Sequence, residues 1–413
     1  MRARQWGRLA AVLAFLGPGI ITGAAGDDAG GIATYASVGA QYGYSLLWVM
    51  VPITLVLIVV QVQVARMGVV TGKGFAELIR EQFGVRWTAF AMLVLLVANG
   101  TVTIAEFAGI AAATDIFDPR LVGPVVVVSA VAVWLIVVRG SYTLAEKIFI
   151  ALSLALLTYV GAALLAHPDW GEVGVSLVTP RMQLDSGYLT TFVAVVGTTI
   201  TPYMLFYLQS SLSDKGVRLD EYPAERTDVI LGSLLTTVVA LFIIVSTAAT
   251  LHREGIVIDT ADDAARALEP FAGPYARVLF GLGLFGASML AASVLPLSTA
   301  YAVCGAFGWE RGVSSSWSQA PIFNGLYTAL IAMGAAFVLI PGLPLIQVIV
   351  ATQFLNGLLL PIVLIFVLRL VNNSDIMGEH TNGPLMNALS YAATGVLILL
   401  TIALLIFSVL GLG

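Results

Sequence analysis

The chain has 413 residues, of which 59% are hydrophobic and only 10% are charged, and its formal net charge is −5. This composition leaves too little polar surface for a soluble globular protein. The single cysteine, Cys304, excludes a disulfide framework or a cysteine metal cluster. We therefore expect a membrane protein whose partner is the lipid bilayer, with no nucleic acid bound.

Apolar segments separated by polar connections predict an all-α polytopic protein with eleven membrane-spanning helices. Several segments approach the ~20 residues that an α-helix needs to cross ~30 Å of hydrocarbon. The short alternating segments that are typical of a membrane β-barrel are absent from the sequence. The predicted spans are 10–40, 44–66, 88–114, 121–138, 144–166, 187–211, 227–251, 273–303, 322–340, 345–370 and 386–411.

The positive charges predict how these spans are oriented. Most Lys and Arg residues fall in connections on the side of the N-terminus, and cytoplasmic loops carry such an excess. We therefore expect a cytoplasmic N-terminus, an external C-terminus and a prokaryotic inner membrane. The first span is too long to be a removable signal peptide, and it lacks the small-residue cleavage site that such a peptide has.

Two carboxylates and three glycines interrupt the first predicted span, in the sequence GDDAGG at 26–31. A charge at bilayer depth is costly, so an acid inside the membrane indicates a functional site. We expect the first helix to break here and to bind a cation. Asp28 is the favoured ligand, and Asp27 is either a second ligand or a helix cap. A register error of one residue turns a helical side chain by about 100°, so the choice between them stays open.

A second interruption, GTTITPY at 197–203, lies in the sixth predicted span. Five helices separate the two breaks, so the second half begins on the opposite side of the membrane. This pattern is typical of inverted repeats whose broken helices meet at a substrate site near the midplane. We expect one transporter domain over 1–413, with repeats at 1–166 and 187–370 and an additional helix at 386–411.

The atoms available at the two breaks favour a hard cation. They are a carboxylate, backbone carbonyls freed by the breaks and threonine hydroxyls, and Mg²⁺ and Mn²⁺ prefer such oxygen ligands. No histidine lies within a predicted span, and the breaks hold no methionine or cysteine. Na⁺ or an organic cation remains open on these residues alone.

Several longer segments resemble one family. They are GPGIITGAAGDDAGGIATYASVGAQYGYSLLW in the first span, ARMGVVTGKGFAELIREQFG after the second, TIAEFAG in the third, and QVIVATQ followed by the DIMGEHTN loop. Together they are similar to Nramp-type divalent metal transporters. The resemblance implies a LeuT-type fold with eleven or twelve helices and transport of divalent transition metals, usually with protons. It implies a transporter and not an enzyme, with no resident cofactor.

The sequence departs from this family at both breaks. The family has Asp-Pro-Gly-Asn where this chain has Asp-Ala-Gly-Gly at 28–31, and Met-Pro-His where this chain has Thr-Pro-Tyr at 201–203. The thioether that favours transition metals and the histidine linked to proton coupling are both replaced. The chain is similar in this respect to the branch of Nramp-related magnesium transporters. We expect a wider, harder site that takes Mg²⁺, and also Mn²⁺, with part of the hydration shell.

The resemblance assigns roles to single residues. Asp28 takes the place of the metal carboxylate, Gln353 that of a glutamine near the ion, and Glu106 that of the acid in the third helix on the proton route. The other expected metal-site residues are Asp27, Gly31 in place of the asparagine ligand, Thr198 through its carbonyl, and Thr201 in place of the methionine. Tyr203, in place of the histidine, and Asn356 are expected accessory residues.

We expect uptake by alternating access, driven by the membrane potential, in a protein that functions as a monomer and does not require protons. Two other transport functions remain alternatives: a proton-coupled Mn²⁺ or Fe²⁺ transporter, and a transporter of a small organic solute on the same fold. A membrane enzyme is disfavoured because Asp27 and Asp28 lack a partner cluster with catalytic spacing.

Overall fold

The computed structural model describes residues 28–138, 154–183, 185–312 and 317–410, which form helices joined by turns and loops. The α-helices are α3 (Ala29–Tyr42), α4 (Met50–Thr71), α5 (Phe75–Asp115), α6 (Val122–Val138), α8 (Thr158–Leu165), α9 (Trp170–Val178), α10 (Ser186–Thr199), α11 (Pro202–Asp214), α12 (Tyr222–Thr247), α13 (Ala261–Arg266), α14 (Glu269–Ala272), α15 (Ala276–Phe307), α16 (Pro321–Val338), α17 (Leu345–Val371), α18 (Ser374–Met377) and α19 (Pro384–Leu410).

Short turns of other helix types extend several of these elements. A π-helical turn at Ala248–His252 continues α12. The 3₁₀ turns are Leu47–Val49, Pro119–Leu121, Leu154–Leu157, Gly273–Tyr275 and Gly378–His380.

Within the described residues, nine helical segments are long and apolar enough to cross a membrane. They coincide with the predicted spans two to four and six to eleven, which are confirmed. The first and fifth predicted spans lie partly outside the described residues, so the total of eleven stays a prediction. The chain is a multi-pass membrane protein.

The third span begins much earlier than predicted. Helix α5 starts at Phe75 instead of residue 88, where the Glu77 side chain accepts a hydrogen bond of 3.2 Å from the Gly74 N–H and so caps the helix start. Gly84, with φ of +73°, then bends the chain before the apolar run begins. The segment before this bend, which we had expected to be a connection, is an additional stretch of helix.

The sixth span is broken, as predicted, but the break is shorter than the interval at 197–203. Helix α10 continues to Thr199, Ile200 and Thr201 leave helical geometry, and Pro202 opens α11. Proline is well suited to a first helical position because it has no N–H to satisfy.

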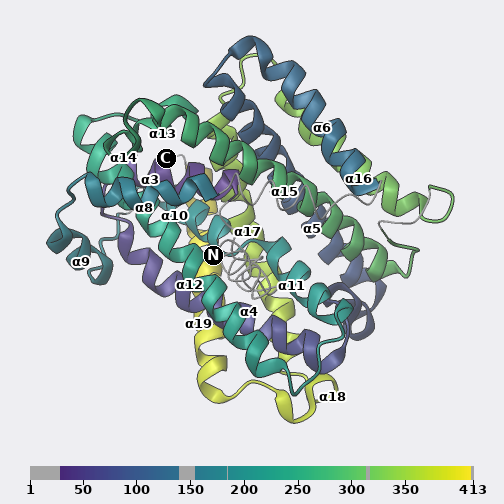
Figure 1. The fold of residues 1–413 in the computed structure, drawn as a ribbon. Helices are drawn as coiled ribbons and strands as arrows, with labels where there is room; N and C mark the ends of the chain where they lie inside the picture. The colour runs from purple at the N-terminus through teal and green to yellow at the C-terminus, as the bar shows by residue number, and fades with distance from the viewer. Residues whose placement is uncertain (1–27, 139–153, 184, 313–316, 411–413) are drawn as a thin grey trace, which may run out of the picture.

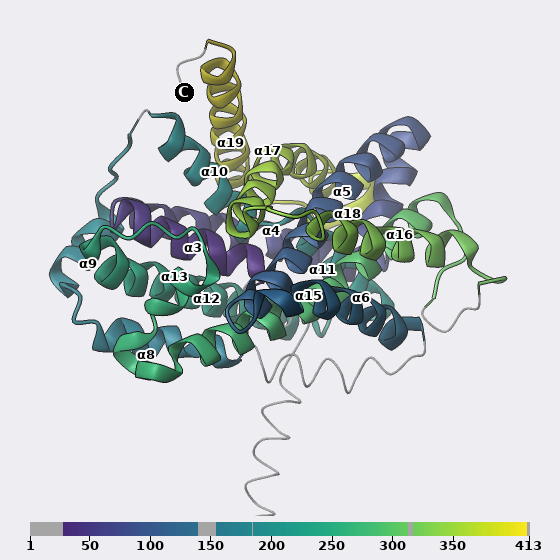
Figure 2. The same ribbon diagram turned by 90° about the horizontal axis from the view of Figure 1, so that it is seen from above.

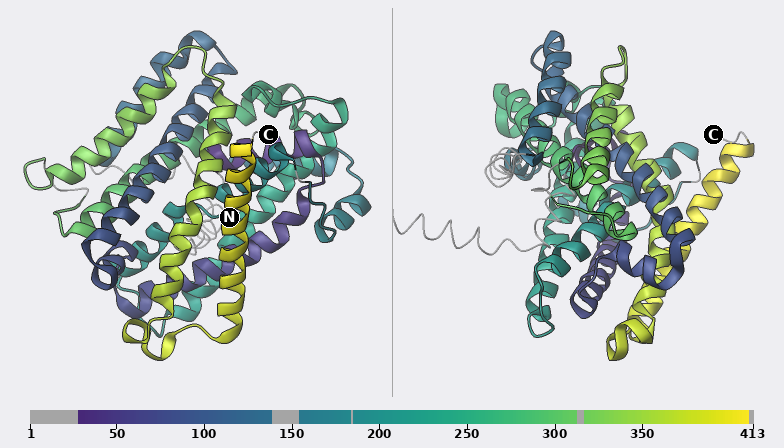
Figure 3. Two further views of the ribbon diagram at one scale, coloured as in Figure 1. Left: turned by 180° about the vertical axis from the view of Figure 1, so that it is seen from behind. Right: turned by 90° about the vertical axis from the view of Figure 1, so that its right-hand side faces the viewer.

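The helices form one bundle with two distinct flanks. Helices α5 and α15 pack along one another, and α17 crosses α5, α10 and α3. Helices α6 and α16 lie side by side at one end of the bundle, with α9 at the other (Figures 1 and 2). Helix α19 lies against α17, α10 and α4 on an outer face, where the view from behind shows it (Figure 3).

Glycines allow the broken helix to approach α17 closely. A Cβ at Gly197 would clash with the carbonyl oxygen of Gln353 and the amide nitrogen of Gly357, and a Cβ at Gly357 would clash with the carbonyl of Val193. Small residues permit such backbone contact between membrane helices. This contact places the end of α10 beside Gln353.

We expect Gly197→Ala to destabilise the protein by about 1–3 kcal/mol, because the backbone of α17 cannot move aside as a side chain could. The measurement is thermal unfolding of the purified protein in detergent. Gly395→Ala in α19 is the matched control, since a Cβ there meets nothing within 4 Å. Equal melting temperatures for the two variants would contradict the packing described here.

Candidate functional site

Asp28 lies at the N-terminus of α3 and is almost completely buried, with 2% of its surface exposed. Its Oδ1 accepts a hydrogen bond of 2.8 Å from the Gly31 N–H, so its carboxyl group caps the helix. Its Oδ2 has no hydrogen-bond partner. One oxygen of this carboxyl group therefore holds the helix start, and the other is available to a ligand.

A second buried acid meets the same helix end. Glu106 of α5 is fully buried, and its Oε2 accepts a hydrogen bond of 3.4 Å from the Ala29 N–H, while its Oε1 has no partner. The carboxyl groups of Glu106 and Asp28 lie close enough to interact. Two neighbouring acids in a buried site are costly when both are ionised, unless they share a proton or a cation.

The break between α10 and α11 supplies a free carbonyl. In a continuous helix the Thr198 carbonyl would accept from the residue four positions on, but that residue is Pro202, which has no N–H. The hydroxyl of Thr198 is also buried without a partner. This carbonyl lies at the C-terminal end of α10, where the helix dipole favours a cation.

Thr201 and Tyr203 lie just beyond the break and are both 1% exposed. Tyr203 lies near the carboxyl groups of Asp28 and Glu106 and beside the Thr201 hydroxyl. Next to it, Met204 packs in an apolar cluster with Val102, Ala291 and Leu295.

Helix α17 closes the site with two amides. The Gln353 side chain lies directly over Gly30. It lies so close that a Cβ atom on Gly30 would clash with the Gln353 amide. Asn356 donates to the Oε1 of Gln353 at 3.3 Å, and its own Oδ1 has no partner. Both amides are fully buried. Asn356 therefore positions Gln353 above the start of α3.

The fold thus brings together the predicted residues from four parts of the chain: Asp28, Glu106, Thr198, Thr201, Tyr203, Gln353 and Asn356. Gly31 also lies at the site, where its N–H donates a hydrogen bond to the Asp28 carboxyl group. Asp27 lies outside the described residues. The sequence leaves open a helix cap by Asp27, and in the structure Asp28 forms the cap of α3.

Sequence inspection missed a contact beside the site. The hydroxyls of Tyr35 and Thr199 are 2.8 Å apart and fully or almost fully buried, and they join α3 to α10. The available signal was spacing, since Tyr35 follows Asp28 by two helical turns and therefore lies on the same face. Gln61 of α4 was also missed, although it is a buried amide with neither polar atom paired.

The donor set of the site consists of oxygen atoms in a buried, polar setting. No group of three or more His, Cys, Asp or Glu side chains within the described residues could hold a metal ion. Two carboxyl groups, an amide and a freed carbonyl suit a hard divalent cation that keeps some of its water. Leaving buried polar atoms unpaired costs about 1–3 kcal/mol each, which is typical of a site whose ligand completes the contacts.

Comparison with known proteins identifies the family. Residues 19–407 match the family model described as natural resistance-associated macrophage protein-like, or Nramp. The chain is 30% identical over 383 residues to the divalent metal cation transporter MntH of Deinococcus radiodurans, covering 89% of this chain and 84% of that protein. It is 28% identical over 402 residues to the MntH of Burkholderia ambifaria, covering 94% and 88%.

Solved structures show the same fold. The manganese transporter of Eremococcus coleocola superposes with a TM-score of 0.73 at 18% identity, covering 97% of this chain and 87% of that one. MhsT in complex with L-phenylalanine superposes with a TM-score of 0.60 at 15% identity, covering 94% and 97%. The LeuT-type fold is therefore confirmed, and the chain belongs to the Nramp family.

Proposed function

We propose that this chain carries divalent metal cations across the membrane by alternating access, with the ion bound between Asp28 and the break of the sixth span. The observation that best supports this proposal is the pair of buried carboxyl groups of Asp28 and Glu106, each with one unpaired oxygen. The relatives named above are divalent metal cation transporters, which supports the same class of substrate here.

Within this class we propose a preference for Mg²⁺, with Mn²⁺ also carried. The residues nearest the break offer oxygen atoms, and the nearby Met204 packs in an apolar cluster. A site without thioether or imidazole ligands gains little from a soft metal. Asp28, Thr198, Thr201 and Gln353 are the proposed ligands, directly or through water, with Tyr203 and Asn356 as accessory residues.

The proposed mechanism moves the two repeats around this site, so that Asp28 faces each side of the membrane in turn. Membrane potential supplies roughly 2.3 kcal/mol per charge per 100 mV, or about twice that for a divalent ion. Uptake therefore does not require protons. The proposal places a monomer in a prokaryotic inner membrane, with the N-terminus cytoplasmic and the C-terminus external.

One observation favours a second candidate, a proton-coupled Mn²⁺ or Fe²⁺ transporter. Glu106 bonds the backbone beside Asp28, and the two carboxyl groups interact. Such a pair can hold one proton when no cation is bound and lose it when a cation arrives. This candidate differs from the first in whether a proton leaves with each ion.

We expect Asp28→Asn to abolish binding of Mg²⁺ and Mn²⁺ in isothermal titration calorimetry of the purified protein. Asparagine caps a helix as well as aspartate does, so the start of α3 is kept and only the charge is lost. The metal affinity should fall by more than the about 10–100-fold that is lost when a residue that only supports a metal ligand is removed.

Asp185→Asn is the matched control for this variant. Asp185 caps α10 in the same way, accepting a 2.8 Å bond from the Tyr188 N–H, but it is exposed and distant in sequence from the break. Unchanged metal affinity in Asp28→Asn, or an equal loss in Asp185→Asn, would remove Asp28 from the ligand set.

We expect Thr201→Met to raise the preference for Mn²⁺ over Mg²⁺ by roughly tenfold, or about 1.4 kcal/mol, because a thioether is a soft ligand. The measurement is initial uptake of each ion into proteoliposomes. Thr201→Val separates the gain of sulfur from the loss of the hydroxyl. A ratio that changes equally in both variants would argue against Thr201 as a selectivity residue.

We expect Mg²⁺ uptake to leave the internal pH of proteoliposomes unchanged when the membrane potential is clamped. A pH-sensitive dye inside the vesicles makes the measurement, beside the Glu106→Gln variant. Acidification in the wild type that disappears in Glu106→Gln would establish the proton-coupled candidate instead.

A further inference from the structure

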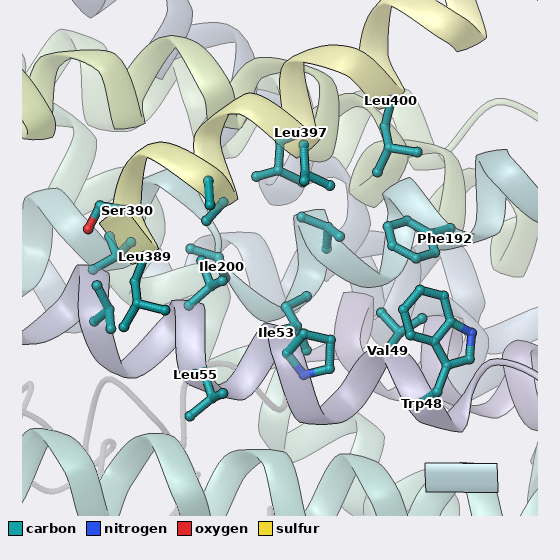
Figure 4. Close-up of a pocket in the computed structure, with 18 of the residues that line it drawn as sticks. Trp48, Val49, Ile53, Leu55, Phe192, Ile200, Leu389, Ser390, Leu397 and Leu400 are labelled. Atoms are coloured by element: carbon teal, nitrogen blue, oxygen red, sulfur yellow. The ribbon is translucent and has the colours of Figure 1, made fainter. Parts of the chain in front are cut away.

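An apolar cavity of about 400 Å³ lies between α19 on one side and α4 with α10 on the other. Figure 4 shows side chains from all three helices around this space, among them Ile53, Phe192 and Leu397. Ser390 is the one lining residue with a hydroxyl, and that hydroxyl is already bonded to Gln63 at 2.5 Å. The cavity therefore offers only apolar contact to whatever fills it.

The cavity reaches the back of the broken helix. Its lining includes Val196 in the last turn of α10 and Ile200 in the break itself. Ile200 directly precedes Thr201, which lies on the side of the proposed metal site. A molecule in the cavity would thus support the break from the side opposite the ion.

The cavity is open toward the surroundings of the bundle. Several of its lining residues are exposed at the rim, among them Leu55 at 56%, Val396 at 53% and Leu389 at 44%. These residues belong to α4 and α19, which are membrane-spanning segments. What meets this opening in the membrane is therefore the hydrocarbon of the bilayer.

The length of the cavity matches one leaflet. Its lining on α19 runs from Leu389 to Leu400, which at a rise of ~1.5 Å per residue is about 17 Å. The hydrocarbon core of a bilayer is ~30 Å thick, so one leaflet contributes about half of that. A single acyl chain has this length. A volume of about 400 Å³ over this length is too small for a second membrane helix, which is roughly 10 Å across.

Aromatic side chains lie at one end of the cavity. The lining residue Trp48 donates a hydrogen bond from its indole to the Tyr188 hydroxyl at 3.2 Å. The Tyr188 hydroxyl in turn donates to the carbonyl of Arg181, which directly precedes the lining residue Met182. Arg181 itself does not line the cavity and lies in a separate polar pocket with Glu172 and Arg253. Tryptophan and tyrosine at the end of a span are typical of the level of lipid headgroups.

We propose that this cavity binds one acyl chain of a membrane phospholipid. The apolar lining, the length of one leaflet, the opening toward the bilayer and the aromatic residues at one end all fit this ligand. The inference goes beyond the proposed function and does not depend on which ion is carried. The bound chain completes the packing behind the break, between α10 and α19.

The test is native mass spectrometry of the protein released from nanodiscs of phosphatidylglycerol. We expect the wild type to retain one phospholipid and Ala393→Trp to lose it, because Ala393 lines the cavity and the indole would fill it. Leu399→Trp is the matched control, since Leu399 lies on the same helix, is 67% exposed and does not line the cavity. The control should retain the lipid.

A second control leaves the cavity unchanged. Arg181→Gln alters an exposed residue that does not line the cavity and should retain the phospholipid. Equal retention in wild type and Ala393→Trp would overturn the proposal, as would an equal loss in Leu399→Trp or Arg181→Gln. A dimer that Ala393→Trp dissociates would assign the cavity to a second copy of the chain.

Discussion

The burial of the Asp28 carboxyl group is the constraint on which the rest of the site depends. A charge at this depth is tolerated only where several groups stabilise it. The start of α3 supplies the Gly31 N–H and the positive end of a helix dipole, which favour the ionised form. These groups satisfy one oxygen only. The other oxygen is unpaired, as is one oxygen of the neighbouring Glu106 carboxyl group. A cation would complete such a set, and a proton shared between the two carboxyl groups would satisfy part of it.

The break in the sixth span and the glycines are arranged around this buried carboxyl group. Pro202 frees the Thr198 carbonyl, because a proline cannot donate the hydrogen bond that would close the turn. The close approach at Gly197 and Gly357 then places α17 beside the break, and Gly30 leaves room for the Gln353 amide. Each of these glycines lacks a side chain that a stable helix would normally have. The fold is therefore locally weakened around the candidate site, which is a common feature of functional sites.

The side of the break opposite the polar site lies against an apolar environment. Ile200 is turned toward the apolar cavity between α10 and α19, while its neighbour Thr201 belongs to the polar site. Two non-helical residues thus separate an oxygen-rich site from an apolar space. The packing of α19 matters for this reason, although it lies outside the two predicted repeats. Its contacts with α4 and α10 make it part of the wall behind the site.

Much of this protein could be predicted from local patterns in the sequence. Hydrophobic length predicted nine spans that the structure confirms, because each helix must satisfy its own backbone within the bilayer. The acid in GDDAGG and the Pro202 motif predicted a buried carboxyl group and a broken sixth span, since the costs of both features are local. The early start of α5 was missed because Gly74 and Glu77 form a cap in a polar segment that resembles a loop.

Only the tertiary structure decided which of the polar atoms meet. The sequence determined that Asp28, Glu106 and Gln353 exist at membrane depth, but not that Glu106 bonds the Ala29 backbone or that Gln353 lies over Gly30. Contacts between residues so far apart in the chain arise from helix packing, which no local pattern records. The same holds for the bond between Tyr35 and Thr199 and for the cavity behind Ile200. Local sequence sets where a helix can begin, end or break, and packing sets what the freed groups contact.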